Sequence, residues 1–444
     1  MHYQKVILIL ALLSFTAWTH FPDPARAAKL SEETLQQKKE GWYPTGMPLA
    51  NYSSDTGLGY GARAYFYFNG SRDDSYFSTT PFFAEIFAQF YKSTGGISYH
   101  CLSADFPYIM GTQFRLISYI DYDLALNSNY FGVGAASSDA GLRTPDGGSF
   151  RTYQSLNDTF IEQGTKAASR RKVHSYTRER FSWTTRLRRT WNEIASVSVG
   201  AYFSKASIDD WSGREFKLED STELSEPTLL SLDSADLTGL DGGWVNSLSL
   251  ALSYDTRDFA PDPTQGWLAE YVLERATSFI GSDYTYFRQT FLAAGAYSLW
   301  GRWILAGRIA FTDIQGEAPF YEMGLFNRST GRDDGIGGAR TGRGFLLRRF
   351  IGNTMVIAQW DNRFFVGDTV ILGQRFGLQV LGFVDVGNVY DDPSQLFNKP
   401  RLNQLKVSYG GGFVIPWNLS TLVHAVVGWS SEGMAISMDF GHAF

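Results

Sequence analysis

The chain has 444 residues, a formal charge of −6 and a single cysteine, Cys101. The acidic balance argues against a nucleic-acid partner, which requires a basic surface, and a single cysteine excludes a disulfide within the chain. Aromatic residues make up 16% of the sequence, although its mean hydropathy is slightly negative, at −0.19. This combination favours strands with one apolar and one polar face, and it suits the aromatic girdles of a membrane barrel.

The first 27 residues have the features of an export signal. Lys5 gives a positive start, residues 6–17 form a mostly apolar run, and Ala25-Arg26-Ala27 offers a small-x-small cleavage site. An N-terminal membrane anchor is the alternative, but the run is shorter than the roughly 20 apolar residues that a spanning helix needs. We therefore predict a cleaved signal peptide over residues 1–27.

Residues 28–57 are predicted to form a short periplasmic lead-in. Its second half contains the turn-forming residues Pro44, Gly46 and Pro48. The segment is too short to fold as an accessory domain, because domains below roughly 40 residues rarely fold alone.

From Leu58 the sequence alternates with a period of two: Leu58, Tyr60 and Ala62 share one face. A pleated strand produces such an alternation because successive side chains point to opposite faces. We predict an all-β fold, a single transmembrane antiparallel barrel over residues 58–444 with about sixteen strands. The expected strands are 58–69, 77–91, 95–106, 112–126, 150–163, 173–189, 193–207, 244–257, 267–277, 285–299, 302–313, 353–366, 374–387, 404–416, 420–430 and 434–444.

The connections between these strands are of two kinds. Tight turns alternate with long loops at 208–243, 314–352 and 388–403, which is the layout of an outer-membrane barrel. The 127–149 connection is long where this strand count expects a short turn.

The last predicted strand has Phe440 and Phe444 on one face. A soluble sandwich is the alternative to a membrane barrel, but some sixteen long strands after an export signal favour the barrel. The sheet must close in lipid, because an open edge leaves backbone groups unsatisfied at a cost of several kcal/mol each. We expect Phe440 and Phe444 to form a C-terminal assembly signal.

Four short motifs then occur in the order found in one family of outer-membrane proteins. They are Tyr254-Asp255-Thr256-Arg257-Asp258 with Pro263-Thr264-Gln265-Gly266, then Gly342-Arg343-Gly344-Phe345, Asp361-Asn362-Arg363 and Gly382-Phe383-Val384-Asp385-Val386-Gly387. The set resembles the BamA/TamA-like outer-membrane assembly superfamily, also called the bacterial surface antigen family. That family usually has Glu-x-Arg where this chain has Asp361-Asn362-Arg363, so the acid here has a shorter reach.

The resemblance implies that the Arg343-Gly344-Phe345 tip of a long loop folds into the barrel lumen. Strand periodicity independently points Asp361 and Asp385 inward, and a planar guanidinium can bridge two carboxylates. We therefore predict that Arg343, Gly344 and Phe345 form a loop latch. Its partners are Asp361, Phe383, Asp385 and Gly387. The alternative is an Arg343 that lies in a mobile, solvated extracellular loop.

The best-known members of the family carry POTRA domains before the barrel, whereas only residues 28–57 precede the predicted barrel here. The resemblance therefore implies a barrel-only member in the bacterial outer membrane. Its implied role is assembly or translocation of outer-membrane protein or lipid, through a weak seam between strands 58–69 and 434–444. Expected partners are outer-membrane lipid, and either client membrane proteins or a separate periplasmic partner. Glycines near the expected seam fit weak pairing: Gly59, Gly61, Gly433 and Gly441.

Enzyme activity is not expected. The sequence has no Gly-x-Ser-x-Gly elbow and no His-Glu-x-x-His motif, so no catalytic residue, cofactor or metal site is predicted. Acid pairs such as Asp73-Asp74 could bind calcium, but solvated loop acids are commoner. Two other functions stay open: a passive or plugged pore, and a surface adhesin or receptor that acts through the 208–243 loop.

Overall fold

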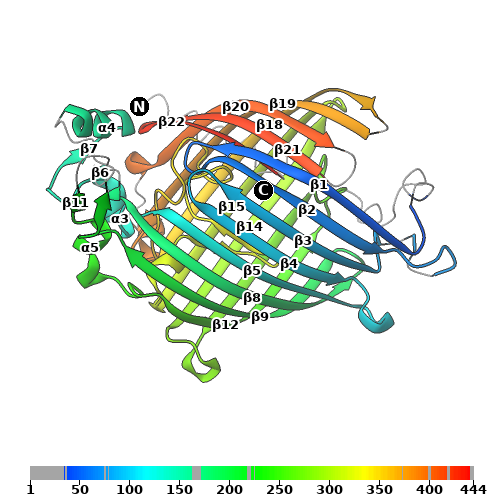
Figure 1. Cartoon of the computed structure of the whole chain (residues 1–444). Helices are drawn as coiled ribbons and strands as arrows, with labels where there is room; N and C mark the ends of the chain where they lie inside the picture. Colours follow the sequence, from blue (N-terminus) through cyan, green and yellow to red (C-terminus); the bar gives the residue numbers. More distant parts are fainter. Residues whose placement is uncertain are drawn as a thin grey trace.

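The computed structural model is a closed antiparallel barrel of sixteen strands (Figure 1). Each strand pairs with the next along the chain, and β1 closes the sheet against β22. The predicted fold class and strand number are confirmed. The structure describes residues 35, 38–74, 77–78, 80–162, 172–217, 222–224, 226–372, 374–398, 402–417 and 421–440.

The barrel strands are long, and the elements outside the wall are short. The wall consists of β1 (Trp42–Ser53), β2 (Gly57–Phe68), β3 (Ala84–Ser93), β4 (Ile97–Phe106), β5 (Phe114–Asn129), β8 (Ser175–Trp191), β9 (Ala195–Asp210), β12 (Gly243–Asp255), β13 (Gly266–Ala276), β14 (Thr285–Leu299), β15 (Trp303–Glu317), β18 (Thr354–Ile371), β19 (Gln374–Tyr390), β20 (Lys406–Trp417), β21 (Thr421–Ser430) and β22 (Gly433–Phe440). The connections hold α3 (Gly134–Asp139), α4 (Tyr153–Glu162), α5 (Leu229–Leu232), α6 (Ser394–Asn398) and the short strands β6 (Leu142–Arg143), β7 (Ser149–Phe150), β10 (Glu215–Lys217), β11 (Thr222–Leu224), β16 (Leu325–Asn327) and β17 (Arg332–Asp334). None of the helices in the described ranges has both the length and the apolar content to span a membrane.

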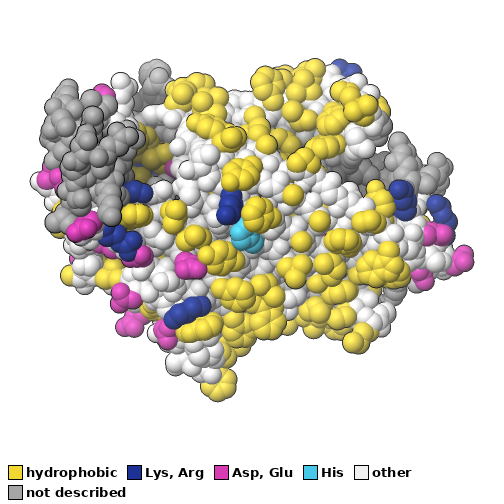
Figure 2. All heavy atoms as spheres, viewed as in Figure 1, with side chains coloured by type: hydrophobic (Ala, Val, Ile, Leu, Met, Phe, Trp, Pro, Cys, Tyr) yellow, Lys and Arg dark blue, Asp and Glu magenta, His cyan; other side chains and the backbone are white. Residues whose placement is uncertain are grey.

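Side chains alternate between the two faces of the wall. On β12, Leu248 and Leu250 are exposed on the outside, whereas on β14 the side chains of Arg288 and Thr290 are fully buried on the inside. On the face shown in Figure 2, hydrophobic side chains spread over the strands, and most charged side chains lie towards the two ends. An apolar outside around a polar inside is the arrangement that a barrel in lipid requires.

Two differences between the expected and observed strands cancel in the count. Residues 42–53, expected in the lead-in, form β1, so the barrel begins at Trp42 rather than Leu58. Residues 150–163, expected as a strand, instead contain α4. The Thr152 hydroxyl accepts a hydrogen bond from the Ser155 amide at 3.1 Å, as an N-cap residue does. With both corrections, the long connection before β8 lies at the same end as the other long loops.

The prolines of β1 explain why this strand reads as a turn. The Asn69 amide donates to the Gly41 carbonyl at 2.9 Å, so Gly41 and Asn69 are a hydrogen-bonded pair of the β1–β2 ladder. Hydrogen-bonded pairs alternate along an antiparallel ladder, so the backbone nitrogens of Pro44 and Pro48 point away from β2, towards the β22 side. Proline is tolerated there because it lacks only a donor that an edge does not need.

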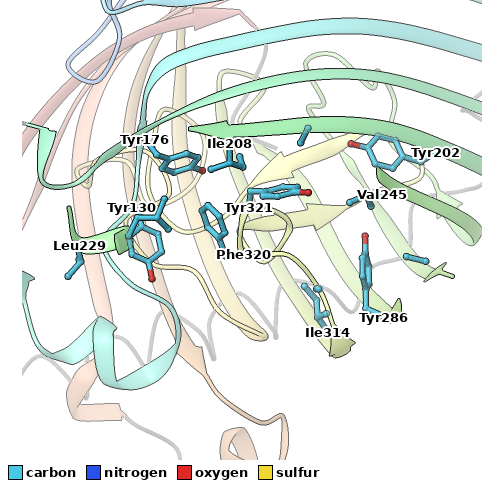
Figure 3. Packing of buried hydrophobic residues seen from close by; sticks show 14 residues of the cluster. Tyr130, Tyr176, Tyr202, Ile208, Leu229, Val245, Tyr286, Ile314, Phe320 and Tyr321 are labelled. Carbon is cyan, nitrogen blue, oxygen red and sulfur yellow. The ribbon is translucent and has the colours of Figure 1, made fainter. Parts of the chain in front are cut away.

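The three longest connections, 130–174, 211–242 and 318–353, lie at one end of the barrel, and both ends of the wall (Trp42 and Phe440) lie at the other. An aromatic cluster packs these connections against the strands (Figure 3). Phe320 lies against Tyr130, Tyr176 and Tyr321, with ring centroids 5.2–5.6 Å apart. The long loops therefore cover their end of the barrel as one packed layer.

Within the described part of the chain, which ends at Phe440, the seam between β1 and β22 is short. Its ladder consists of Tyr52 with Met438 and Ser53 with Ser437, extended by the Ser54 amide, which donates to the Ile436 carbonyl at 3.0 Å. The expected position of the seam at strand 58–69 was wrong, because β2 is paired with β1 and β3 on both sides. Gly59 and Gly61 therefore do not belong to the seam, whereas Gly433 begins β22; Gly441 lies outside the described residues.

The seam register can be tested with engineered cysteines in a Cys101→Ser background. The bond from Ser54 makes Ser53 and Ser437 a non-hydrogen-bonded pair, whose Cα atoms lie about 4.5 Å apart, within the range for a disulfide. We expect Ser53→Cys with Ser437→Cys to cross-link on mild oxidation, seen as a reducible mobility shift on a denaturing gel. Ser53→Cys with Ala435→Cys, which is two residues out of register, should not. Equal cross-linking of both pairs would contradict this register.

Candidate functional site

The connection 318–353 folds back into the barrel lumen. It contains the β16–β17 hairpin and then a segment whose aromatic residues are buried. Phe345 packs against Phe350 with ring centroids 5.0 Å apart, in a cluster that also contains Ile336 of the loop and wall residues such as Met355 and Ile357. The predicted inward-folded loop is therefore present, and its tip is packed rather than solvated.

Arg343 lies at the centre of the site and is only 3% exposed. One terminal nitrogen of its guanidinium donates to Asp361 Oδ1 at 2.6 Å and to Asp385 Oδ1 at 2.7 Å. Its Nε donates to Asp385 Oδ2 at 2.9 Å, and its own backbone amide donates to the same oxygen at 2.8 Å. The arginine therefore bridges two carboxylates from neighbouring strands, both of which are also buried.

The other residues predicted around Arg343 lie where they support this bridge. The guanidinium carbon is 3.9 Å from the centroid of the Phe383 ring, within cation–π distance. Gly387 faces the loop, since a Cβ atom there would come within 3.0 Å of Ile336. Gln359 was not predicted as part of the site, and it donates to Asp385 Oδ1 at 3.1 Å and to the Arg340 carbonyl at 2.8 Å.

Glycines allow the loop tip to approach the wall. Gly344 has φ = +143°, and a Cβ atom there would lie 2.9 Å from the Trp429 carbonyl oxygen. At Gly428 on β21, a Cβ atom would lie 1.9 Å from the Arg343 carbonyl oxygen. The Ser430 hydroxyl donates to the Gly344 carbonyl at 2.8 Å. The tip therefore spans the lumen side of β18 to β21.

A second group of buried charges holds the β16–β17 hairpin. Arg288 donates to Glu274 at 2.9 Å, and Arg332 of the hairpin contacts Glu274 and Glu322, each at 2.5 Å. Arg308 contacts Asp333 at 2.9 Å. This group was not predicted from the sequence. Its detectable signal was the presence of charged residues inside predicted membrane strands, since such residues must face the lumen.

The Asp-Thr-Arg-Asp and Pro-Thr-x-Gly motif forms the turn between β12 and β13. Asp258 accepts hydrogen bonds from the Thr264 hydroxyl and the Thr264 amide at 2.5 and 2.9 Å, which closes the turn. The neighbouring Asp262 contacts Arg363 of β18 and Gln379 of β19, each at 2.7 Å. The same two strands that hold Arg343 are therefore also held by this turn, on β18 through Arg363, two residues from Asp361, and on β19 through Gln379.

The predicted assembly signal is only partly visible. Phe440 ends β22, and its ring lies 4.7 Å from the Arg63 guanidinium carbon. Phe444 lies outside the described residues, so the assembly signal stays a prediction. Among the described residues, no group of three or more His, Cys, Asp and Glu side chains could hold a metal ion.

Comparison with protein families decides the identity of this barrel. Residues 119–422 match the Omp85 superfamily domain. The chain belongs to the Omp85 superfamily. This membership confirms the superfamily recognised from the motifs and the location of this Omp85 barrel in the bacterial outer membrane. Residues 25–83 match a second family, a domain of unknown function named DUF5982. No curated protein matches the sequence.

Solved structures share the fold of this Omp85 barrel. BamA from Haemophilus ducreyi lacking POTRA domains 1–3 is 14% identical with a TM-score of 0.51, and the match covers 91% of this chain and 70% of that one. CdiB from Escherichia coli is 9% identical with a TM-score of 0.50, and the match covers 92% and 69% of the two chains. Because these identities are low, the likeness extends to the fold alone.

One acid beside the seam of this Omp85 barrel is electrostatically unusual. Asp55 lies in the turn between β1 and β2, and burial raises its pKa to about 6, although hydrogen bonds from the Leu347 amide and the Asn129 side chain act in the opposite direction. Because this value exceeds that of an ordinary carboxyl, ionised Asp55 lowers stability above about pH 6, and that cost declines as the pH falls towards 4.

Removing the guanidinium should release the loop of the Omp85 barrel. Arg343→Ala leaves two buried carboxylates without their partner, which typically costs about 3–5 kcal/mol. We expect a lower unfolding midpoint in urea and rapid proteolysis between residues 318 and 353, with Arg343→Lys intermediate because it loses the planar fork. Arg375→Ala, which breaks an exposed pair with Asp368, is the control and should change little. Unchanged loop protection in Arg343→Ala would refute the latch.

The close approach of the tip gives a second, independent test. Gly428→Ala should displace the loop, because its new methyl group would collide with the Arg343 carbonyl. Gly382→Ala on β19 is the matched control, since no atom lies within 4 Å of the Cβ position there. We expect faster loop proteolysis in Gly428→Ala alone. Equal protection of the two variants would mean that the tip does not rest on β21.

Proposed function

We propose that this barrel assembles or translocates outer-membrane polypeptides through the seam between β1 and β22. Membership of the Omp85 superfamily implies outer-membrane assembly or translocation as the general role. The choice of route rests on the seam itself, and the choice of polypeptide rests on the chemistry that an opened seam would present.

The observation that carries the proposal is the length of the seam. Within the described residues, β1 and β22 share two residue pairs, whereas every other pair of neighbouring barrel strands shares eight or more. Pro48 also lacks the backbone donor that a longer seam ladder in this register would use at its position. The seam is therefore the line along which the wall opens at least cost.

An opened seam would present backbone donors and acceptors at its edges. In lipid these groups need partners, and an added strand supplies them as main-chain hydrogen bonds. A polypeptide strand can pair with the available donors and acceptors all along such an edge, whereas a lipid headgroup satisfies only a few groups. This asymmetry supports a membrane polypeptide over lipid as the client.

The filled lumen supports the seam over a central pore. Phe326, Phe345 and Phe350 of the loop are each no more than 2% exposed inside the barrel. A solute moving along the axis would have to pass through this packed loop, whereas a strand added at the seam joins the wall and does not cross the lumen. Large and steady conductance of the wild-type barrel in a bilayer would instead favour a passive pore.

The proposal is tested by locking the seam in cells. Ser53→Cys with Ser437→Cys, in a Cys101→Ser background, should cross-link β1 to β22 and reproduce the envelope defect of a deletion strain. A reducing agent should restore function. The matched control is Gln89→Cys, which can pair with native Cys101, its register partner on the fully laddered β3–β4 interface.

The readouts are outer-membrane permeability and the abundance of outer-membrane barrel proteins, measured by quantitative proteomics. We expect both to change in the locked seam variant and neither to change in the control. Full complementation by a seam that is shown to be cross-linked would overturn the proposal. A change in lipid composition with unchanged protein abundance would reassign the client to lipid.

A further inference from the structure

The inward-folded loop also contacts both strands of the seam. On the β22 side, Arg340 donates to Asp439 Oδ2 at 3.1 Å and to the Phe440 carbonyl at 2.6 Å. Arg349 donates to Glu432, in the turn between β21 and β22, at 2.8 Å. The last strand is thus held by the loop at its beginning and near its described end.

The β1 side is held through the turn that follows this strand. The Leu347 amide donates to Asp55 Oδ2 at 3.1 Å. The Asn129 side chain donates to Asp55 Oδ1 at 3.0 Å and to the Leu347 carbonyl at 3.1 Å, so β5 joins the same contact. Residues 340–349 of the loop therefore reach both edges of the seam from inside the lumen.

Between these contacts the seam is open on its inner side. A cavity of about 180 Å³ lies where the β1–β22 ladder stops. Its walls come from the two seam strands and from the loop, and they include Asn51, Ser53, Arg340, Thr341, Ser437 and Asp439. Because the ladder does not continue there, the two strands are linked through the loop, by Arg340 to β22 and by Leu347 to Asp55 after β1.

We infer that Arg340 is a positioning residue that fixes the last strand against β1, so that loop retention controls seam closure. The inference rests on the proposed function of the seam. Arg343 lies three residues away and anchors the loop to β18 and β19. One segment therefore connects β18 and β19 to the seam, and withdrawal of the loop would break its contacts with both.

Arg340 is a suitable residue to test because its side chain is 44% exposed, so its replacement does not remove a fully buried side chain. The assay is the rate of disulfide formation between Ser53→Cys and Ser437→Cys in the purified barrel, without a client. Arg340→Ala should slow this reaction about fivefold, as expected for loss of a partly exposed ion pair. Hydrogen exchange of β22 should increase in parallel, while β18 and β19 stay protected.

Substitutions that change the charge at residue 340 distinguish an electrostatic role of Arg340 from a simple packing role. Gln and Glu have nearly the same size, so Arg340→Gln and Arg340→Glu differ mainly in their electrostatic effect on Asp439. We expect Arg340→Glu to open the seam more than Arg340→Gln, and high salt to reduce that difference. Arg340→Lys should retain most of the wild-type rate. Arg375→Ala, which removes another exposed Arg–Asp pair far from the seam, is the control.

The inference is overturned if Arg340→Ala and Arg340→Glu cross-link at the wild-type rate. That result would leave the seam function intact, because the cellular locking experiment tests the function with Arg340 present. Conversely, the Arg340 variants could slow cross-linking while the locked seam causes no envelope defect in cells. That result would mean that the loop positions the last strand but that clients do not pass through the seam.

Discussion

A guanidinium inside a barrel must be neutralised where it lies, and Arg343 meets two carboxylates only where the loop reaches β18 and β19 together. Breaking one side of such a buried pair costs about 3–5 kcal/mol, a large share of the stability of a typical domain. The geometry therefore restricts much of the surrounding structure. Asp361 and Asp385 must point inward from adjacent strands, and Gly344 and Gly428 must leave room for the backbone of the tip.

Much of this site was predictable because strand periodicity and a short motif agree there. Alternation alone points Asp361 and Asp385 to the polar face, and the position of Arg343 in a long loop suggests a shared partner. The contacts of Glu274, Arg288 and Arg332 were not predictable in the same way. Each residue can be assigned to the lumen, but which charges meet depends on how the hairpin folds over several strands.

The first barrel strand and the connection before β8 were harder to predict than the other strands. Pro44 and Pro48 carry strong local turn signals. Their place in β1 is explained by the edge of that strand, which shares only two residue pairs with the described part of β22. The segment at α4 contains alternating residues, but a helix cap at Thr152 decides its structure. In both places a nonlocal contact or a single side-chain bond outweighed the local pattern, and the two errors left the strand count unchanged.

The prolines of β1 have a further consequence for any strand that docks on this edge. At Pro44 and Pro48 the edge offers carbonyl acceptors but no amide donors. A strand that docks there therefore forms fewer backbone hydrogen bonds with β1. Edges of this kind resist permanent capture, and natural sheets use proline to keep exposed edges from aggregating. The residence time of a visitor would be short, because each missing bond lowers the barrier to departure. An edge from which a docked strand dissociates readily is free to bind another strand.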